Sequence, residues 1–123
     1  MRLKLITIVF LLLSILYSSV NAKEKAISAS RAANYIGTEV LACGKLMEVK
    51  RTSRFYFLNL DAAYPHQSLS IAVPKKSYEN VFQNLGTPYN LVTKVVCAKG
   101  KVIEKKRNIQ IHVNKPQNLS VAK

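Results

Sequence analysis

The chain has few residues of the kinds that form catalytic or metal centres. It contains six acidic residues, two histidines and two cysteines among 123 residues. The acids are single residues scattered along the chain, and His66 and His112 lie in different predicted elements. General acid–base catalysis and metal-assisted hydrolysis need clustered carboxylates, or a histidine with a partner within reach. We therefore expect a protein that is not an enzyme and that needs no cofactor.

The chain also lacks an apolar run of the usual length for a membrane span. Its longest run, residues 5–17, follows two basic residues and is shorter than the roughly 20 apolar residues that a span needs. Small residues at 20–22 then provide a cleavage site. This order predicts a signal peptide over residues 1–22 and a periplasmic or secreted chain that starts at Lys23 and keeps no stable membrane anchor. An uncleaved membrane anchor is the alternative.

Negative charge is scarce relative to positive charge. Nineteen Lys and Arg oppose six Asp and Glu, and without Arg2 and Lys4 the remaining 101 residues, 23–123, carry a net charge of +11. Such a charge suits a polyanionic partner, which could be nucleic acid, an acidic glycan or an anionic membrane surface. The alternative is a basic surface that only keeps a small exported protein soluble. A length of this order is enough for one domain with one core.

Cys43 and Cys97 are the only cysteines. An even number in an exported domain predicts a disulfide, and a loop of about 54 residues would be stabilised by about 4 kcal/mol in the chain-entropy model. The alternative is a zinc site completed by His66 and His112. These four positions lack the closely spaced Cys and His pairs of structural zinc sites.

Two short segments with alternating hydrophobicity lie at the centre of the sequence. Residues 54–60 and 68–73 alternate with a period of two and are separated by a polar turn, which predicts a β-hairpin. In the first segment, Phe55, Phe57 and Asn59 share the face opposite to the leucines.

The other segments extend this hairpin to an all-β domain. We expect the two ends, residues 23–27 and 115–123, to carry no regular structure. The remaining elements are predicted as a short helix at 28–35, strands at 38–50, 89–104 and 109–114, and a helix at 75–85 that carries one apolar stripe. The order of three strands, one helix and two strands is that of the OB-fold, a five-stranded Greek-key β-barrel. The first and fourth strands are neighbours in this topology, which brings Cys43 and Cys97 onto adjacent strands.

Residues 44–51 and 100–107 repeat one pattern, in which a Gly-Lys pair precedes two apolar residues, a Glu and a basic turn. A Gly within a strand indicates a bulge or a sharp bend, so we expect one at Gly44. Both segments are predicted as bent strands that lead into basic turns.

The candidate binding residues combine aromatic and basic side chains. OB-folds bind single strands by stacking bases on aromatic rings within a basic groove, and they use the loops after the first and fourth strands for ligands. Phe57 could instead be buried beneath the N-terminal helix, and the basic clusters could be solvated loops. The predicted site residues are Phe55 and Phe57 on the second strand, Lys50, Arg51 and Arg54 in the first loop, and Lys105, Lys106 and Arg107 in the last.

Several short motifs, taken in order, resemble a known family. Residues 28–121 are similar to small bacterial exported OB-fold domains, which are described as nucleic-acid-binding by fold and also occur attached to secreted nucleases. The matching motifs are Ala-x-Tyr-Ile-Gly at 33–37, Cys-Gly-Lys at 43–45, Phe-Leu-Asn-Leu at 57–60 with Tyr-Pro at 64–65, Val-Cys-x-x-Gly-Lys-Val at 96–102, and Pro-Gln-x-Leu at 116–119.

Two departures from the family pattern bear on the function. The turn before the last strand is Glu-Lys-Lys-Arg-Asn at residues 104–108 rather than a Tyr-x-Gly-x-Pro-like turn, which favours phosphate contacts. The third strand ends in Ala72 and Val73 rather than in a bulky residue, which weakens a base-stacking platform. We therefore expect an exported, non-enzymatic binder of single-stranded nucleic acid or another polyanion. The alternative is a periplasmic adaptor that binds protein or oligosaccharide.

Overall fold

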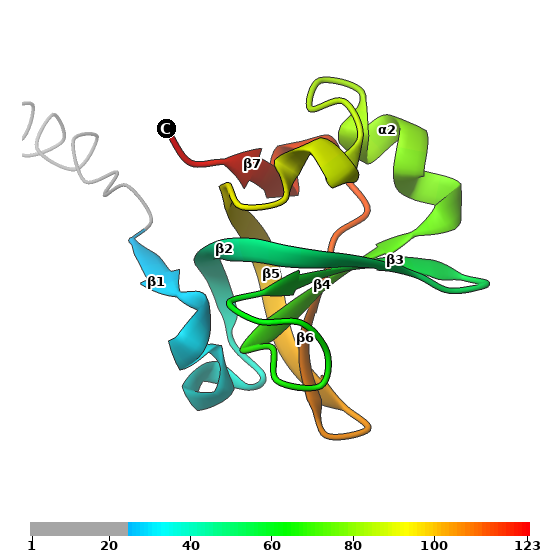
Figure 1. The fold of residues 1–123 in the computed structure, drawn as a ribbon. Helices are drawn as coiled ribbons and strands as arrows, with labels where there is room; N and C mark the ends of the chain where they lie inside the picture. The colour runs from blue at the N-terminus through cyan, green and yellow to red at the C-terminus, as the bar shows by residue number, and fades with distance from the viewer. Residues whose placement is uncertain (1–24) are drawn as a thin grey trace, which may run out of the picture.

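The computed structural model describes residues 25–123, in which short helices separate the strands of one continuous sheet (Figure 1). The predicted signal peptide, residues 1–22, lies outside the described residues. The elements are β1 (Ala26–Ser28), η1 (Ala29–Tyr35), β2 (Glu39–Arg51), β3 (Phe55–Leu60), β4 (Leu69–Pro74), η2 (Lys75–Ser77), α2 (Tyr78–Phe82), η3 (Pro88–Leu91), β5 (Val95–Lys105), β6 (Asn108–His112), η4 (Pro116–Asn118) and β7 (Leu119–Val121).

Five of these strands close into a barrel. β2, β3 and β4 pair antiparallel in sequence, β4 pairs parallel with β6, and β6 pairs antiparallel with β5. β5 then returns to β2, whose residues 39–45 pair with β5 while residues 46–51 pair with β3. This arrangement confirms the predicted five-stranded OB-fold barrel, with α2 between the third and fourth barrel strands.

The irregularity predicted at Gly44 lies slightly further along β2. The register with β3 shifts between Leu46 and Glu48, so Met47 is the extra residue of a β-bulge. Gly44 is needed for a different reason, because a Cβ atom there would lie 2.8 Å from the Cβ of Ala29 in η1. The glycine thus lets the N-terminal helix approach the strand.

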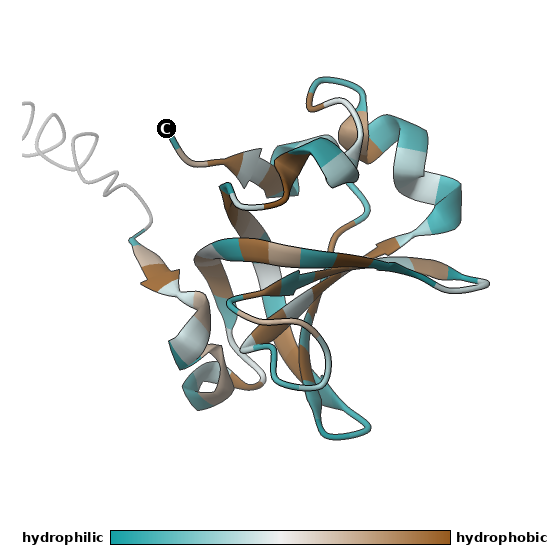
Figure 2. Cartoon of the chain, in the orientation of Figure 1, coloured by the Kyte–Doolittle hydropathy of each residue, from teal (hydrophilic) through white to brown (hydrophobic). Residues whose placement is uncertain are grey.

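The core consists of branched aliphatic side chains from every barrel strand. Leu58 on β3, Ile71 on β4, Val96 on β5 and Ile111 on β6 are completely buried. Burial of one such side chain stabilises the fold by about 1.5–3 kcal/mol. Outside the core, the tip between β5 and β6 is strongly hydrophilic (Figure 2).

Both predicted helices are present in shorter form. Residues 75–85 form η2 and then α2, whose Val81 and Phe82 belong to the hydrophobic core. The predicted apolar stripe therefore faces the core. The N-terminal helix is the 3-10 helix η1, and its Ala32 is completely buried.

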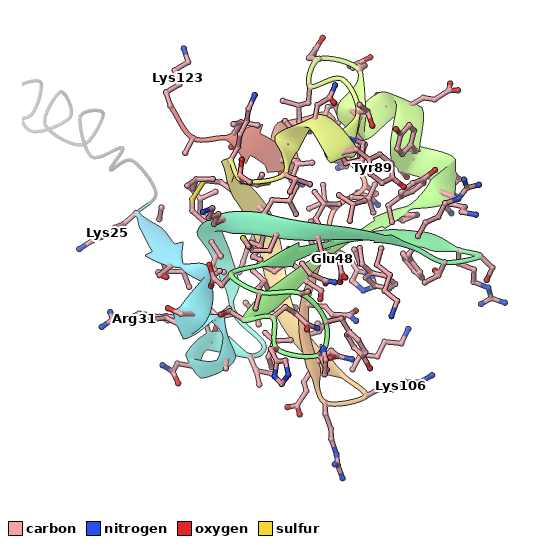
Figure 3. All side chains as sticks on the ribbon, in the orientation of Figure 1. Lys25, Arg31, Glu48, Tyr89, Lys106 and Lys123 are labelled. Carbon is pink, nitrogen blue, oxygen red and sulfur yellow. A yellow bond between two sulfur atoms is a disulfide. The ribbon has the colours of Figure 1, made fainter. Side chains whose placement is uncertain are left out.

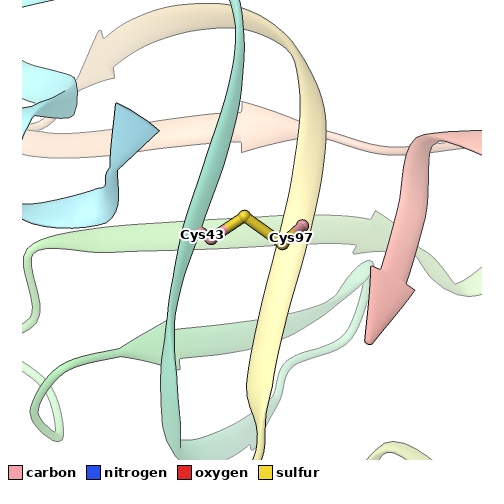
Figure 4. Close-up of a disulfide and its surroundings, with 2 residues drawn as sticks. All are labelled: Cys43 and Cys97. Carbon is pink, nitrogen blue, oxygen red and sulfur yellow. A yellow bond between two sulfur atoms is a disulfide. The ribbon is translucent and has the colours of Figure 1, made fainter. Parts of the chain in front are cut away.

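The predicted disulfide joins the two adjacent strands β2 and β5 (Figure 4). Cys43 and Cys97 are direct partners in the register, and their sulfur atoms are 2.06 Å apart. Both thiols are consumed by this bond, so the zinc site considered as an alternative is wrong.

The strand predicted at residues 89–104 starts too early. Pro88 begins the 3-10 helix η3, Thr87 Oγ1 accepts a hydrogen bond from the Tyr89 backbone N–H, and β5 begins only at Val95. Proline at the first helical position and a threonine cap outweigh the β-branched composition of this segment.

The prediction that both ends lack structure is also wrong. β1 pairs parallel with β2, and β7 pairs antiparallel with β5. Where residues 39–45 of β2 pair with β5, each of these two strands has a second edge that no other barrel strand covers. β1 pairs with this edge of β2, and β7 pairs with this edge of β5. Leu119 in β7 is buried, so the C-terminal segment contributes to the core. No helix within residues 25–123 is long and apolar enough to cross a membrane.

Candidate functional site

The outward face of β3 carries the predicted aromatic residues. Phe55, Phe57 and Asn59 alternate with the inward-facing leucines, and the two rings lie 5.5 Å apart between centroids. Both phenylalanine side chains are half-buried and line clefts on the outside of the barrel. Phe57 is therefore not buried beneath the N-terminal helix.

Three neighbouring clefts, with volumes of about 180, 210 and 410 Å³, lie along this face, and together we call them the groove. Phe57, Asn108 and Gln110 line both the first and the second cleft, and Phe55 and His112 line both the second and the third. We name the clefts by their residues: the amide cleft (Lys50, Thr52, Phe57, Asn59, Tyr64, Gln67, Ser70, Asn108, Gln110), the aromatic cleft (Phe55, Phe57, Lys105, Lys106, Asn108, Gln110, His112) and the distal cleft (Arg54, Phe55, Pro74, Lys75, Lys76, His112).

The groove is strongly basic, and none of the residues that line it is acidic. Four of the six predicted basic residues line it: Lys50, Arg54, Lys105 and Lys106. Arg51 does not, because its side chain lies over the ring of Tyr56, with 5.7 Å between guanidinium carbon and ring centroid. Arg107 lies fully outside at the tip of the β5–β6 turn.

Two further cations were missed by the sequence reasoning. Lys75 and Lys76 follow β4 directly in η2 and line the distal cleft next to Arg54. The sequence pattern predicts these two residues only as the start of the helix after Pro74. A basic pair at the end of a barrel strand was the signal that could have revealed them.

The β5–β6 turn holds its basic side chains in an unusual backbone conformation. Lys106 and Arg107 are the two residues between the paired Lys105 and Asn108, and their φ angles are 50° and 66°. Two-residue hairpin turns of this type favour Asn-Gly, since positive φ is costly for residues with a Cβ atom. Figure 3 shows Lys106 at the tip of this turn, extending away from the barrel.

His112 supplies a third ring to the groove and was not predicted to do so. It pairs with Ala72 in the register, and its imidazole meets Phe55 edge-on at 5.5 Å between centroids. The small Ala72 lies on the third barrel strand where a bulky residue was expected, and the imidazole of the neighbouring His112 provides a ring on that side of the groove. Partial burial, and secondarily the charge of Lys105, lower the pKa of His112.

A relay of hydrogen bonds runs beneath the amide cleft. Glu48 Oε1 accepts hydrogen bonds from Asn59 Nδ2 at 2.8 Å and from the Tyr64 backbone N–H at 3.1 Å. Ser70 Oγ donates to Asn59 Oδ1 at 2.6 Å and accepts from Gln67 Nε2 at 3.2 Å. Gln67 Nε2 also donates to Asn108 Oδ1 at 3.2 Å. The relay thus connects β2, β3, β4 and β6 across the floor of the cleft.

Glu48 is held in its charged form by this relay. The Tyr64 backbone N–H, then the Asn59 amide, and to a smaller extent the charge of Lys50, lower the pKa of the Glu48 carboxyl. Lys50 itself lies over the Tyr64 ring, 4.2 Å from its centroid. The loop between β3 and β4 is therefore fastened to β2 at the mouth of the amide cleft.

Within residues 25–123, no three His, Cys, Asp or Glu side chains come together in a group that could hold a metal ion. His66 is exposed in the loop between β3 and β4. His112 Nε2 lies 3.0 Å from Gln110 Oε1 and donates a hydrogen bond to it in the tautomer that carries the proton on Nε2. The groove therefore offers rings, amides and cations rather than metal ligands.

Comparison with known proteins yields structural similarity without sequence similarity. Neither the comparison with protein-family models nor that with curated sequences finds a match. Two OBodies, AM3L09 and AM1L10, each bound to hen egg-white lysozyme, align with TM-scores of 0.55 and 0.54. They share 15% and 19% sequence identity, over 82% and 85% of this chain and 96% and 98% of theirs.

A putative aspartyl-tRNA synthetase from Leishmania major Friedlin aligns over 84% of this chain with a TM-score of 0.53 and 11% identity. This chain spans only 22% of the length of that synthetase. At such identities the likeness concerns the fold alone. Together with the strand order, it shows that residues 25–123 form a small OB-like barrel.

Proposed function

We propose that this protein is a non-enzymatic binder of single-stranded nucleic acid or another polyanion. The observation that carries the proposal is the groove itself, in which Phe55 and Phe57 lie between basic residues of both hairpin loops. The short motifs within residues 28–121, which we interpret from the sequence as a resemblance to small bacterial exported OB-fold domains, favour the same function.

The chemistry of the groove matches that of sequence-tolerant single-strand binding. An aromatic ring stacks on any base, at about 1–3 kcal/mol per base, while a basic groove follows the phosphates. Lys105 and Lys106 lie beside the rings, and Arg54, Lys75 and Lys76 lie beyond them in the distal cleft. A single strand can place its bases on the rings and its phosphates against these cations.

Binding should depend strongly on salt, and this dependence provides the test. We expect fluorescence anisotropy with a labelled oligothymidylate of about twelve nucleotides to give tight binding at low salt that weakens as salt rises. The logarithm of the affinity should fall linearly with the logarithm of the salt concentration, by about 0.7 per phosphate contact on a single strand. Absence of binding at low salt, or an affinity independent of salt, would contradict the proposal.

A pair of matched variants locates the site. Lys105→Gln with Lys106→Gln removes two cations from the aromatic cleft, and Lys25→Gln with Lys123→Gln removes two exposed cations far from it (Figure 3). The first variant should weaken binding and reduce the salt slope by about 1.4. The second should leave the slope almost unchanged. Equal effects of the two variants would indicate binding through net charge alone.

Export is part of the proposal. It is supported by the predicted signal peptide and by the Cys43–Cys97 disulfide, because disulfides are typical of oxidising compartments. Mass spectrometry of the protein recovered from bacterial cell fractions tests it. We expect a periplasmic or secreted form that begins at Lys23, and a full-length cytoplasmic protein with free thiols would contradict this.

A further inference from the structure

The amide cleft differs in chemistry from the rest of the groove. Four residues with side-chain amides line it, Asn59, Gln67, Asn108 and Gln110, together with the rings of Phe57 and Tyr64. Its volume of about 180 Å³ is below the roughly 300–1,000 Å³ of pockets for drug-sized ligands. The cleft therefore suits one flat ring system rather than a chain of several units.

The relay beneath the cleft fixes which atoms its amides present. A carboxylate only accepts, so Asn59 must direct its Nδ2 to Glu48 and its Oδ1 to the Ser70 hydroxyl. That hydroxyl uses its hydrogen on Asn59, so it can only accept from Gln67 Nε2. The charge of Glu48 thereby sets the orientation of the Gln67 amide through two intervening residues, Asn59 and Ser70.

The consequence is an acceptor without a donor. Gln67 Oε1 is enclosed and has no hydrogen-bond partner, alone among the buried side-chain polar atoms of the described chain. Native proteins leave few buried polar atoms unpaired, and each such atom calls for an explanation. Turning the amide around would not help, because the relay needs its Nε2 where it is.

Gln110 supplies the complementary group. When His112 carries its proton on Nε2, Gln110 Oε1 accepts a hydrogen bond from it. The Nε2 of Gln110 then has no partner among the described residues. The two glutamines then offer one acceptor and one donor in the same cleft. Paired donors and acceptors of this kind match the hydrogen-bonding edge of a nucleobase.

We propose that the amide cleft binds one unstacked nucleobase of the single strand, with Gln67 Oε1 accepting from the base and Gln110 Nε2 donating to it. This inference rests on the proposed function and names the part of the ligand that the cleft takes. The base lies between Phe57 and Tyr64, and the next phosphate lies near Lys50. Gln67 turns slightly outward as the base enters, because its oxygen lies below the cleft surface. A duplex cannot bind in this way, since its base edges are already paired.

The test compares oligonucleotides with and without bases. We expect the wild-type protein to bind oligothymidylate at least tenfold more tightly than an abasic oligodeoxynucleotide of equal length and charge. Gln67→Leu should lose the part of this preference that one base in the cleft contributes, while it keeps its affinity for the abasic strand and the stacking of bases on Phe55 and Phe57. An unchanged preference in this variant would overturn the assignment of the cleft. The matched control Gln83→Leu, an exposed glutamine outside the groove, should retain the preference.

Each outcome separates this inference from the proposed function. If both strands bind equally well to the wild type, the base cleft is wrong and polyanion binding stands. If neither strand binds, the proposed function itself fails.

A second measurement avoids any effect of substitution on folding. In wild-type protein labelled with ¹⁵N, the side-chain amide signal of Gln67 should shift with uridine monophosphate and not with ribose 5-phosphate. Equal shifts, or none, would overturn the assignment of the cleft.

Discussion

Residues 44–51 and 100–107 carry the same sequence pattern but present different members of it to the groove. In β2, Glu48 pairs with Asn59 and Lys50 pairs with Phe57, so the fifth and seventh pattern residues share the face of the groove. In β5, Ile103 pairs with Gln110 and Lys105 pairs with Asn108, so here the fourth and sixth pattern residues share the face of the groove. The two strands are thus out of phase by one residue.

The bulge at Met47 causes this difference. Side chains alternate along a strand, so one extra residue moves every later side chain to the opposite face. Leu46 points into the barrel opposite Leu60, and after the bulge Val49 again packs against the core opposite Leu58. β5 has no such irregularity between Val102 and Lys105. An identical pattern therefore gives a hydrogen-bonded carboxylate in one strand and an exposed one, Glu104, in the other.

The comparison shows that the composition of a strand does not determine its functional face. Register does, and register here depends on one inserted residue. The carboxylate that orients Gln67 and the lysine at the mouth of the amide cleft both lie after that insertion.

Deleting Met47 should have the largest effect, because it removes the bulge. Either Glu48 and Lys50 turn toward the core, or residues 39–45 lose their register with β5 and the pairing of Cys43 with Cys97. Burying unpaired charges costs several kcal/mol, which is comparable with the whole stability of a small domain. We expect no cooperative unfolding transition by circular dichroism in urea. The control Met47→Ala keeps the extra residue and therefore the bulge. The Met47 side chain is 40% exposed, so this variant should lose less than about 1 kcal/mol of unfolding free energy. A folded deletion variant with native groove signals would contradict this account.

Removing the disulfide should have the next largest effect. Cys43→Ser with Cys97→Ser frees the two strands that carry the repeated pattern, whose closed loop spans 54 residues. The chain-entropy model gives a loss of about 4 kcal/mol, measured as the shift in unfolding free energy from urea titration. The groove lies elsewhere on the barrel, so any variant that remains folded should retain its oligonucleotide affinity. A loss of affinity without unfolding would show that the bond also shapes the groove.

Glu48 and Glu104 occupy the same place in the pattern, and their alanine variants form a matched pair. Glu48→Ala leaves the buried Asn59 amide without its partner, which costs about 1–3 kcal/mol. Glu104→Ala changes an exposed side chain and should stay within about 0.5 kcal/mol. Chemical denaturation of both variants measures the difference. Equal losses would mean that the relay does not stabilise the fold.

The charge of Glu48 can be separated from its hydrogen bonds. Glu48→Gln can keep both bonds, because Asn59 and Tyr64 donate to the same oxygen. The pKa of Glu48 is lowered in the folded chain, so its contribution is present above the ordinary carboxyl pKa and is lost as the pH falls through the lowered value. The stability difference between wild type and Glu48→Gln should therefore shrink in acid. A difference that does not vary with pH would contradict this.

The sequence predicted the barrel but only part of the groove. Period-two alternation, the order of the elements and the two cysteines were enough for the closed sheet and for the disulfide, because they depend on burial patterns that are local in sequence. His112, Lys75 and Gln67 could not be found in the same way. They reach the groove through the parallel pairing of β4 with β6 and through the loop after β3, which bring together residues about 40 positions apart. The phase change at Met47 was expected near Gly44, and the error of three residues matters because it decides the face of Glu48.

The smallest effect concerns the turns that end the two segments. Lys106 and Arg107 adopt positive φ, whereas Ser53 in the β2–β3 turn does not. Replacing Lys106-Arg107 by Asn-Gly should therefore stabilise the protein by about 1 kcal/mol, because these residues tolerate the left-handed region that the turn requires. Ser53→Gly should be neutral or slightly destabilising, because it only adds freedom to the unfolded chain.

Urea titration measures both changes, and anisotropy should show that the more stable Asn-Gly variant binds oligothymidylate more weakly. Basic side chains at this turn would then contribute affinity at the expense of stability. If Asn-Gly is both more stable and equally tight, the two turn residues are not part of the binding surface, and phosphate contacts must come from Lys50, Lys105 and the distal cleft.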